Sequence, residues 1–431
     1  VSGASGGTIE LFAGQEITTS GKYIAIGTDG KGGSIDVTAN TIELMSNTID
    51  ASGTMGGGRI RLGGEYQGGK NLLTDEIKNA QILVMNDAAN ITARTTGTDG
   101  AGGRVIVWAD QYTHVSGQFD VTPGTESGAG GFVEVSSDNT LVFNGSVLAS
   151  VDDRKGTLLL DPRSITIKTN CNSGFANNEK CKVISRLTSF ANNYGNSVSA
   201  TPETITDVLD AGTDVELQAY RNITIEDDIN VSAGGAGGNF SMRAGRRITI
   251  QAAIDTDNGD LTLDANNCSG VNNCSNGADR RGDGVGLILI DTGGSINTGT
   301  GDFTATVGDE DNSGDITLRD LTTTNLVVTN NGTTLGSDIL DEGSLTVSGT
   351  SAFTTVVSDG VITLDSAHAL TGAVTLTTNS SSTSANATLD NGTTALNLAA
   401  STIGGTLTLT SGHASGIIDS GLVTVGGNLV A

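Results

Sequence analysis

The chain has 431 residues with 62 glycines, 3 prolines and only 3% aromatic residues, a composition that excludes ordinary compact globular domains and favours a repetitive β architecture. Its 22 basic and 48 acidic residues give a formal net charge of −26, which argues against nucleic acid and anionic membrane surfaces as partners. No stretch is long and apolar enough for a transmembrane helix, and the N-terminus lacks the basic and apolar regions of a signal peptide.

One short phrase recurs along the chain, mostly in its first half: two glycines, any residue, an apolar residue, any residue and a second apolar residue. The phrase begins at Gly6, Gly32, Gly57, Gly102, Gly130, Gly237 and Gly404, and the early copies are 26, 25, 45 and 28 residues apart. Alternation within a phrase, as at Ile35 and Val37, indicates a strand with one buried face. Repetition at this period predicts a parallel β-helix whose glycine pairs turn the corners.

The repeat lapses in the middle of the chain and returns at the phrase VELQA. We expect an insertion there, containing a local disulfide between Cys171 and Cys181, because their spacing matches no common zinc pattern. Thr201, Pro202 and Gly212 are suited to cap, begin and follow a short helix. Disulfides in polar loops indicate an oxidising, extracytoplasmic location.

The next coils carry a second predicted loop disulfide, between Cys268 and Cys274. Close to it lies the triplet Arg281, Gly282 and Asp283, which is a candidate receptor-binding motif of the kind that docks into integrins. The alternative is a chance occurrence in a chain so rich in glycine and acidic residues.

Two runs of alternating carboxylates precede glycine turns. They contain Asp255 and Asp257, and Asp309, Asp311 and Asp315. Oxygen ligands at this spacing are typical of calcium loops, although neither run is followed by the bidentate glutamate of an EF-hand. We therefore keep two interpretations, weak calcium binding and solvated corners of the β-helix, and predict no other cofactor.

Beyond about residue 285 the phrases become rich in Thr, Ser and Asn, as in GDITL, GSLTV, GVITL and GAVTL. The period remains while the corners change, so we place a boundary near Gly294. The predicted organisation is Gly-rich coils at 1–170, the helix-bearing insertion at 171–213, further coils with a Cys-bearing loop at 214–293, and Thr/Ser/Asn-rich repeats at 294–431.

The phrases GGRVIVWADQYTHVSGQFDV, GGFVEVSSDNTLVFNGSV and GTLLLDPRSITI, then the insertion and VELQAYRNITIEDDINV, resemble the filamentous-haemagglutinin-like exoproteins of two-partner secretion. The resemblance implies an all-β, right-handed parallel β-helix, export through an outer-membrane partner, and a role in adhesion, aggregation or biofilm. The Asn-Pro-Asn motifs of that family's secretion domain are absent, so the sequence is expected to correspond to mid-protein material.

The function expected from these features is that of a secreted adhesin or matrix protein, a rod that contacts a host-cell receptor or an exopolysaccharide and performs no catalysis. A self-assembling filament and a polysaccharide-active enzyme are the alternatives. The enzyme is disfavoured because aromatic sugar platforms are sparse and none of the three histidines has a convincing Ser or Cys context. No nucleic-acid partner and no membrane insertion are expected.

Overall fold

The computed structural model describes residues 4–69, 77–169, 199–234, 237–268 and 284–431. These residues are almost entirely β, and the chain divides into two units. Unit 1 comprises Val1–Gln218 with Val231–Asn239, and unit 2 comprises Ala219–Asn230 with Phe240–Ala431. Each unit is a parallel β-solenoid, which confirms the predicted fold class. The finer division at residues 170, 213 and 293 stays a prediction.

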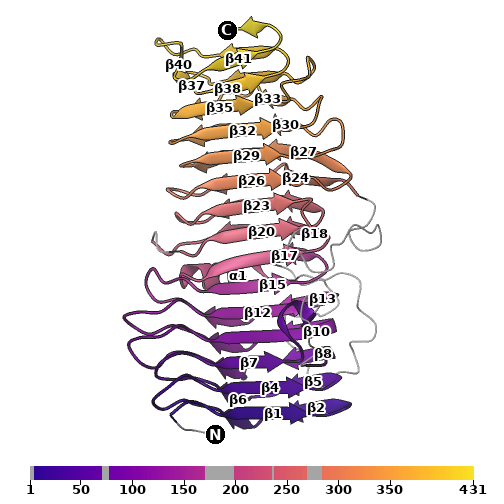
Figure 1. The fold of residues 1–431 in the computed structure, drawn as a ribbon, viewed down its shortest axis with the longest axis vertical. Coiled ribbons are helices and arrows are strands. Elements are labelled where there is room, and N and C mark those ends of the chain that lie inside the picture. Colours follow the sequence, from indigo (N-terminus) through magenta and orange to yellow (C-terminus); the bar gives the residue numbers. More distant parts are fainter. Residues whose placement is uncertain (1–3, 70–76, 170–198, 235–236, 269–283) are drawn as a thin grey trace. The chain divides into compact units, whose positions relative to one another are not determined.

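In unit 1 the strands of each coil pair in parallel with those of the coils before and after it (Figure 1). The first sheet contains β1 (Thr8–Phe12), β4 (Ser34–Thr38), β7 (Arg59–Leu62), β10 (Arg104–Val115), β12 (Phe132–Ser137), β15 (Thr157–Asp161) and β17 (Asp214–Ala219). The second contains β2 (Glu16–Thr19), β5 (Thr41–Leu44), β8 (Ala80–Met85), the second half of β10, and β13 (Thr140–Phe143). The third contains β3 (Lys22–Ile24), β6 (Thr48–Asp50), β9 (Asn90–Thr92), β11 (Gln118–Asp120) and β14 (Ser146–Leu148), and β16 (Ile165–Ile167) is bridged to Ala200.

The predicted glycine phrases form the first sheet of unit 1, and their apolar residues stack in columns. Ile35 lies opposite Ile60, and Ile60 lies opposite Val105, with all three side chains fully buried. Each fully buried side chain of this kind contributes roughly 1.5–3 kcal/mol of transfer free energy. The core of the unit is therefore a set of apolar columns that run along the stack.

The glycine pairs are required by close backbone approach. A Cβ atom on Gly57 would lie 1.9 Å from the carbonyl oxygen of Ala93, and one on Gly102 would lie 1.9 Å from that of Val121. Neither glycine has a positive φ, so close approach and not a left-handed backbone requires glycine here. Only a residue without a side chain fits between the strand of one sheet and the backbone at the end of another.

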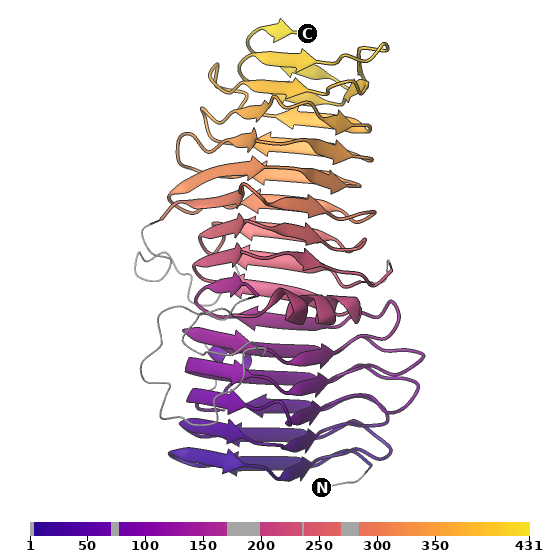
Figure 2. The same cartoon turned by 180° about the vertical axis from the view of Figure 1, so that it is seen from behind.

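The predicted short helix is confirmed as α1 (Pro202–Asp210) in unit 1. Thr201 is its N-cap and accepts a hydrogen bond from the Thr204 N–H, while Gly212 follows its end with φ of 75°. Its apolar stripe of Ile205, Val208 and Leu209 is buried. The helix contacts β14 and lies beside the strands of unit 1, as Figure 2 shows.

Unit 2 also has three parallel sheets. The first contains β20 (Phe240–Ala244), β23 (Leu261–Ala265), β26 (Phe303–Val307), β29 (Leu326–Asn330), β32 (Ser351–Thr355) and β35 (Ala373–Thr377), followed by β37 (Leu396–Leu398) with β40 (Ile417–Asp419) and β38 (Ser401–Ile403) with β41 (Val423–Val425). The second contains β18 (Asn222–Ile225), β21 (Arg247–Ile250), β24 (Gly286–Ile290), β27 (Ser313–Leu318), β30 (Ile339–Asp341), β33 (Ile362–Leu364), β36 (Ala387–Asp390), β39 (Leu407–Thr410) and β42 (Leu429–Val430). The third contains β19 (Ile229–Asn230), β22 (Ala253–Asp255), β25 (Ser295–Asn297), β28 (Leu321–Thr323), β31 (Leu345–Val347) and β34 (Ala369–Leu370).

Cys268 is the one cysteine that lies among the described residues, and it packs against the side chain of Tyr220. Cys171, Cys181 and Cys274 lie outside them, so the two disulfides stay predictions. Within the described ranges, no helix has the length and apolar character needed to cross a membrane.

Candidate functional site

The predicted receptor-binding triplet of Arg281, Gly282 and Asp283 lies outside the described residues. The two carboxylate runs proposed for calcium are described, and both lie in unit 2.

The first carboxylate run bonds to its own turn and to the following coil. Asp255 accepts hydrogen bonds from the Asp257 N–H at 2.9 Å and from the Asn297 side-chain amide at 2.8 Å. In the second run, the Asp315 carboxylate accepts the N–H of Asp338 at 2.9 Å. No group of three potential metal ligands occurs in the part of the chain that the structure describes, and calcium binding stays a prediction.

Other acidic and amide side chains at the corners of unit 2 also join neighbouring coils. Asp302 accepts both the backbone N–H and the side-chain amide of Asn325, at 3.1 and 2.8 Å. Asn325 in turn accepts the backbone N–H and the hydroxyl of Thr350. These side chains satisfy backbone donors that would otherwise lose their partners where the strands end.

A group of charged side chains lies on the outward-facing side of the first sheet of unit 1. We call this surface the outer face. One register column on it runs through the opposed residues Asp36, Arg61, Ile106, Glu134, Leu159 and Glu216. Charged side chains on a solvated sheet are ordinarily exposed, but Arg61 is only 3% exposed and Glu134 is completely buried.

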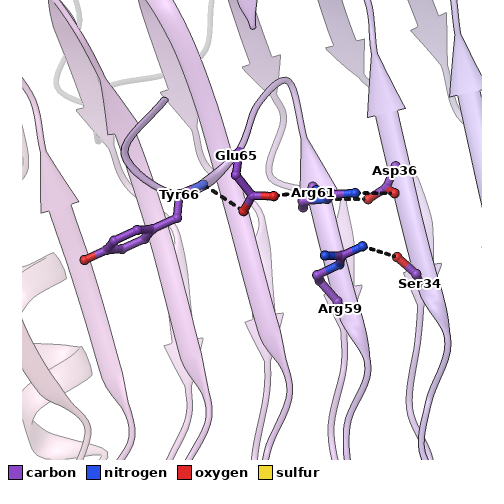
Figure 3. Close-up of polar contacts among 6 residues, drawn as sticks. All are labelled: Ser34, Asp36, Arg59, Arg61, Glu65 and Tyr66. Atoms are coloured by element: carbon purple, nitrogen blue, oxygen red, sulfur yellow. Dashed lines mark hydrogen bonds and ion pairs between the residues drawn. The ribbon is translucent and has the colours of Figure 1, made fainter. Parts of the chain in front are cut away.

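Arg61 joins two carboxylates, as Figure 3 shows. It donates two hydrogen bonds of 2.8 Å to Asp36 and pairs with Glu65. Although burial acts to lower it, the pKa of Arg61 is raised by these two carboxylates. Burial likewise acts to raise the pKa of Glu65, yet the Tyr66 N–H and the Arg61 guanidinium lower it. Arg61 and Glu65 therefore stay ionised at neutral pH, and together with Asp36 they form a compact structural network.

Glu134 lies between the apolar side chains of Ile106 and Leu159 in the register column, and both of these are also buried. Burial raises its pKa to about 8, and the hydrogen bond from the Gln67 N–H and the charge of Arg104 offset this only in part. The Gln67 N–H approaches the two carboxylate oxygens at 3.0 and 3.3 Å. Glu134 is therefore largely protonated at neutral pH.

The loop that follows β7 covers this part of the outer face. Its short 3-10 turn η1 (Tyr66–Gly69) contains Gln67 with φ of 50°, and the Gln67 side chain donates to Gln218 at 3.1 Å. A Cβ atom on Gly68 would lie 2.6 Å from the Trp108 ring, which is 1% exposed. The glycines let the loop lie directly on the indole, and this contact removes Glu134 and Trp108 from solvent.

Two exposed arginines flank the covered region, Arg59 on β7 and Arg104 on β10. They lie directly opposite each other in the parallel register. The Arg104 guanidinium stacks over the rings of Tyr66 and Phe132, at 4.7 and 4.6 Å from their centroids. Arg59 donates a long hydrogen bond of 3.5 Å to the hydroxyl of Ser34.

Two buried histidines occur among the described residues. In unit 1, burial lowers the pKa of His114 to about 4. In unit 2, His368 accepts the backbone N–H of Leu345 through Nδ1 at 3.1 Å, and its Nε2 lies 3.8 Å from the carboxylate of Asp341. Burial lowers the pKa of His368 more than the charges of the surrounding aspartates raise it. Both histidines are therefore neutral at pH 7.

The sequence pattern located the outward positions of these strands but not the charged network on them. A period of two places residues on a face, whereas the pairing of Asp36 with Arg61 depends on the register between coils. The one local signal was the segment GGEYQGG after β7, where two glycine pairs enclose an acidic residue and an aromatic one. Compared with models of protein families and with curated proteins, the sequence has no match.

Proposed function

We propose that this chain is an extracellular structural and adhesive protein, similar to the filamentous-haemagglutinin-like exoproteins, that works by surface recognition and without catalysis. The observation that carries the proposal is the β-solenoid fold. Continuous parallel pairing presents the outward side chains of each unit at a regular spacing of about 4.8 Å from coil to coil. Solenoid proteins use such extended surfaces to bind partners.

The state of the carboxylates on the outer face supports a non-catalytic role. General acid or base catalysis requires a group within hydrogen-bonding reach of the substrate. Asp36 and Glu65 are engaged with Arg61, and Glu134 is buried beneath Gln67. The most strongly perturbed carboxyl group of the outer face thus has a protein partner and no solvent exposure.

The phrases that resemble the exoprotein family and the cysteines in polar segments support export and an extracellular location. By the same resemblance, an outer-membrane protein would be the secretion partner. The ligands that suit an adhesive solenoid are a host-cell receptor or an exopolysaccharide.

The proposal is tested by incubating the purified chain with a panel of neutral and acidic polysaccharides. Retention on the polymer is measured by co-sedimentation, and cleavage is measured from new reducing ends and unsaturated products. We expect retention on at least one polymer with no increase in chain ends. A time-dependent release of new ends would contradict the non-catalytic function and favour a β-helical polysaccharide enzyme.

A further inference from the structure

Two like charges lie side by side on the outer face of unit 1. Arg59 and Arg104 are exposed residues at opposite positions of adjacent parallel strands. Like charges directly opposite each other destabilise a sheet, and strands lie only about 4.8 Å apart. The chain has 48 acidic residues that could neutralise such a pair. A shortage of acidic residues therefore does not explain why the two arginines lie side by side.

A third arginine on the same strand, Arg61, has its charge neutralised by carboxylates. Arg61, two residues along β7 from Arg59, is bound by Asp36 and Glu65, and Figure 3 shows Arg59 apart from this network, beside Ser34. Of the described residues, no carboxylate lies within ion-pair distance of Arg59 or Arg104.

Each arginine interacts electrostatically with one nearby carboxyl group, but neither carboxyl group neutralises its arginine. Arg59 acts on Glu65, but Glu65 is bound by Arg61. Arg104 acts on Glu134, which is buried and has its pKa raised to about 8. Glu134 is thus mostly uncharged at neutral pH, and the positive charge of the two arginines remains available to an external anion.

Arg104 is also held in place before any ligand arrives. Its guanidinium stacks on Tyr66 and Phe132, whose ring centroids are 6.0 Å apart in an edge arrangement. Stacking engages the flat face of a guanidinium and leaves its in-plane N–H groups for an acceptor, and a planar fork of this kind matches a carboxylate. Little side-chain entropy is lost when such a prearranged group binds.

We propose that Arg59, Arg104 and the hydroxyl of Ser34 form a binding site for the carboxylate of a uronic-acid sugar within an extracellular polysaccharide. The inference rests on the proposed adhesive function and names a partner for it. The formal charge of −26 opposes an anionic ligand at long range, but at physiological salt such repulsion is screened beyond about 8 Å. The contact with two guanidinium groups acts inside that distance.

The test uses trigalacturonate and its methyl ester, which differ in carboxylate charge, with binding measured by calorimetry at physiological salt. We expect the acid to bind and the ester to bind much more weakly. Arg59→Gln and Arg104→Gln should each weaken binding of the acid about tenfold, the loss expected on removing one charge-assisted partner. Arg104→Lys should also weaken it, because lysine keeps the charge and lacks the planar fork.

Arg94→Gln is the matched control. Arg94 also belongs to unit 1, with half of its side chain exposed, and it faces Asp120 at 3.6 Å, away from the proposed site. It should bind trigalacturonate like the wild type. The fluorescence of Trp108 in each variant reports whether the outer face keeps its fold.

Three results would overturn the inference: equal binding of acid and ester, wild-type binding by both folded glutamine variants, or tighter binding of a sulfated trisaccharide than of the uronate. Failure at this site leaves the adhesive function testable, because retention on neutral polysaccharides does not involve Arg59 or Arg104. Loss of all polysaccharide retention would instead contradict the proposed function itself.

Discussion

Replacing Glu134 with glutamine tests the burial of the outer face. The pKa of Glu134 is raised from 4.5 to about 8 by burial, so the folded unit keeps a proton that the unfolded chain releases above about pH 4.5. A raised pKa contributes stability that is fully present below the unfolded value and is lost as the pH rises toward the folded value. The wild type should therefore weaken between pH 4.5 and 8, whereas a glutamine at this position does not titrate.

The size of the effect follows from the two pKa values. Each pH unit between them corresponds to about 1.4 kcal/mol, which gives roughly 3 kcal/mol at pH 7 and roughly 5 kcal/mol at pH 8 and above. Glutamine must also place its amide N–H groups where the protonated acid has one O–H, but this cost is the same at every pH and leaves the trend with pH unchanged. The Gln67 N–H retains an acceptor in the variant.

The assay is denaturant unfolding at pH 5, 7 and 8.5, followed by the fluorescence of Trp108. This is the only tryptophan in the sequence, and it is buried on the outer face. We expect the stability of Glu134→Gln relative to the wild type to rise progressively from pH 5 to pH 7 and pH 8.5. Glu126→Gln, an exposed position in the same unit, is the control and should show no such trend. A difference between Glu134→Gln and the wild type that is the same at all three pH values would refute the reasoning.

Three further substitutions test the rest of the structure. Val107→Asp places a charge in a fully buried column of unit 1 and should cost roughly 4 kcal/mol or more in unfolding free energy; a folded variant of unchanged stability would count against the stacked core. Asn330→Ala removes a buried side chain that donates hydrogen bonds to the carbonyls of Gly314 and Asp338, and it should lower the free energy of unfolding by roughly 1–3 kcal/mol. An unchanged temperature of thermal unfolding would mean that these bonds are absent. His368→Gln should abolish the loss of hydrogen-exchange protection at the Leu345 amide in acid, measured relative to the intrinsic exchange rate at each pH. Protonation of the histidine removes the acceptor of that N–H while glutamine retains one; equal pH dependence of protection in both proteins would exclude this mechanism.

The strands were predictable where a local pattern carried the information. Alternation at Ile35 and Val37 predicted which side chains face the core, and both are buried in β4. The helix at Pro202–Asp210 was predictable for the same reason, because its cap, first residue and terminating glycine lie within one short segment.

The outer face could not be predicted, because it depends on contacts between distant segments. Ile106 and Glu134 occupy outward positions that alternation assigns to solvent, yet both are buried. The cause is the loop after β7, two coils before Glu134, in which the Gln67 N–H reaches Glu134 across 67 positions of sequence. The contacts of the carboxylate runs also depend on the register between coils. Asp315 follows the turn pattern of a calcium loop, and its carboxylate accepts the N–H of Asp338 in the neighbouring coil.

Attachment under flow tests most directly whether the folded solenoid is an adhesive surface. Beads coated with the wild-type chain are passed over cultured epithelial cells and over films of bacterial exopolysaccharide, beside beads coated with Val107→Asp. We predict that wild-type beads are retained on at least one surface several-fold more than Val107→Asp beads. Retention of wild-type beads at the level of uncoated beads on every surface, with the chain shown to be folded, would contradict an adhesive function.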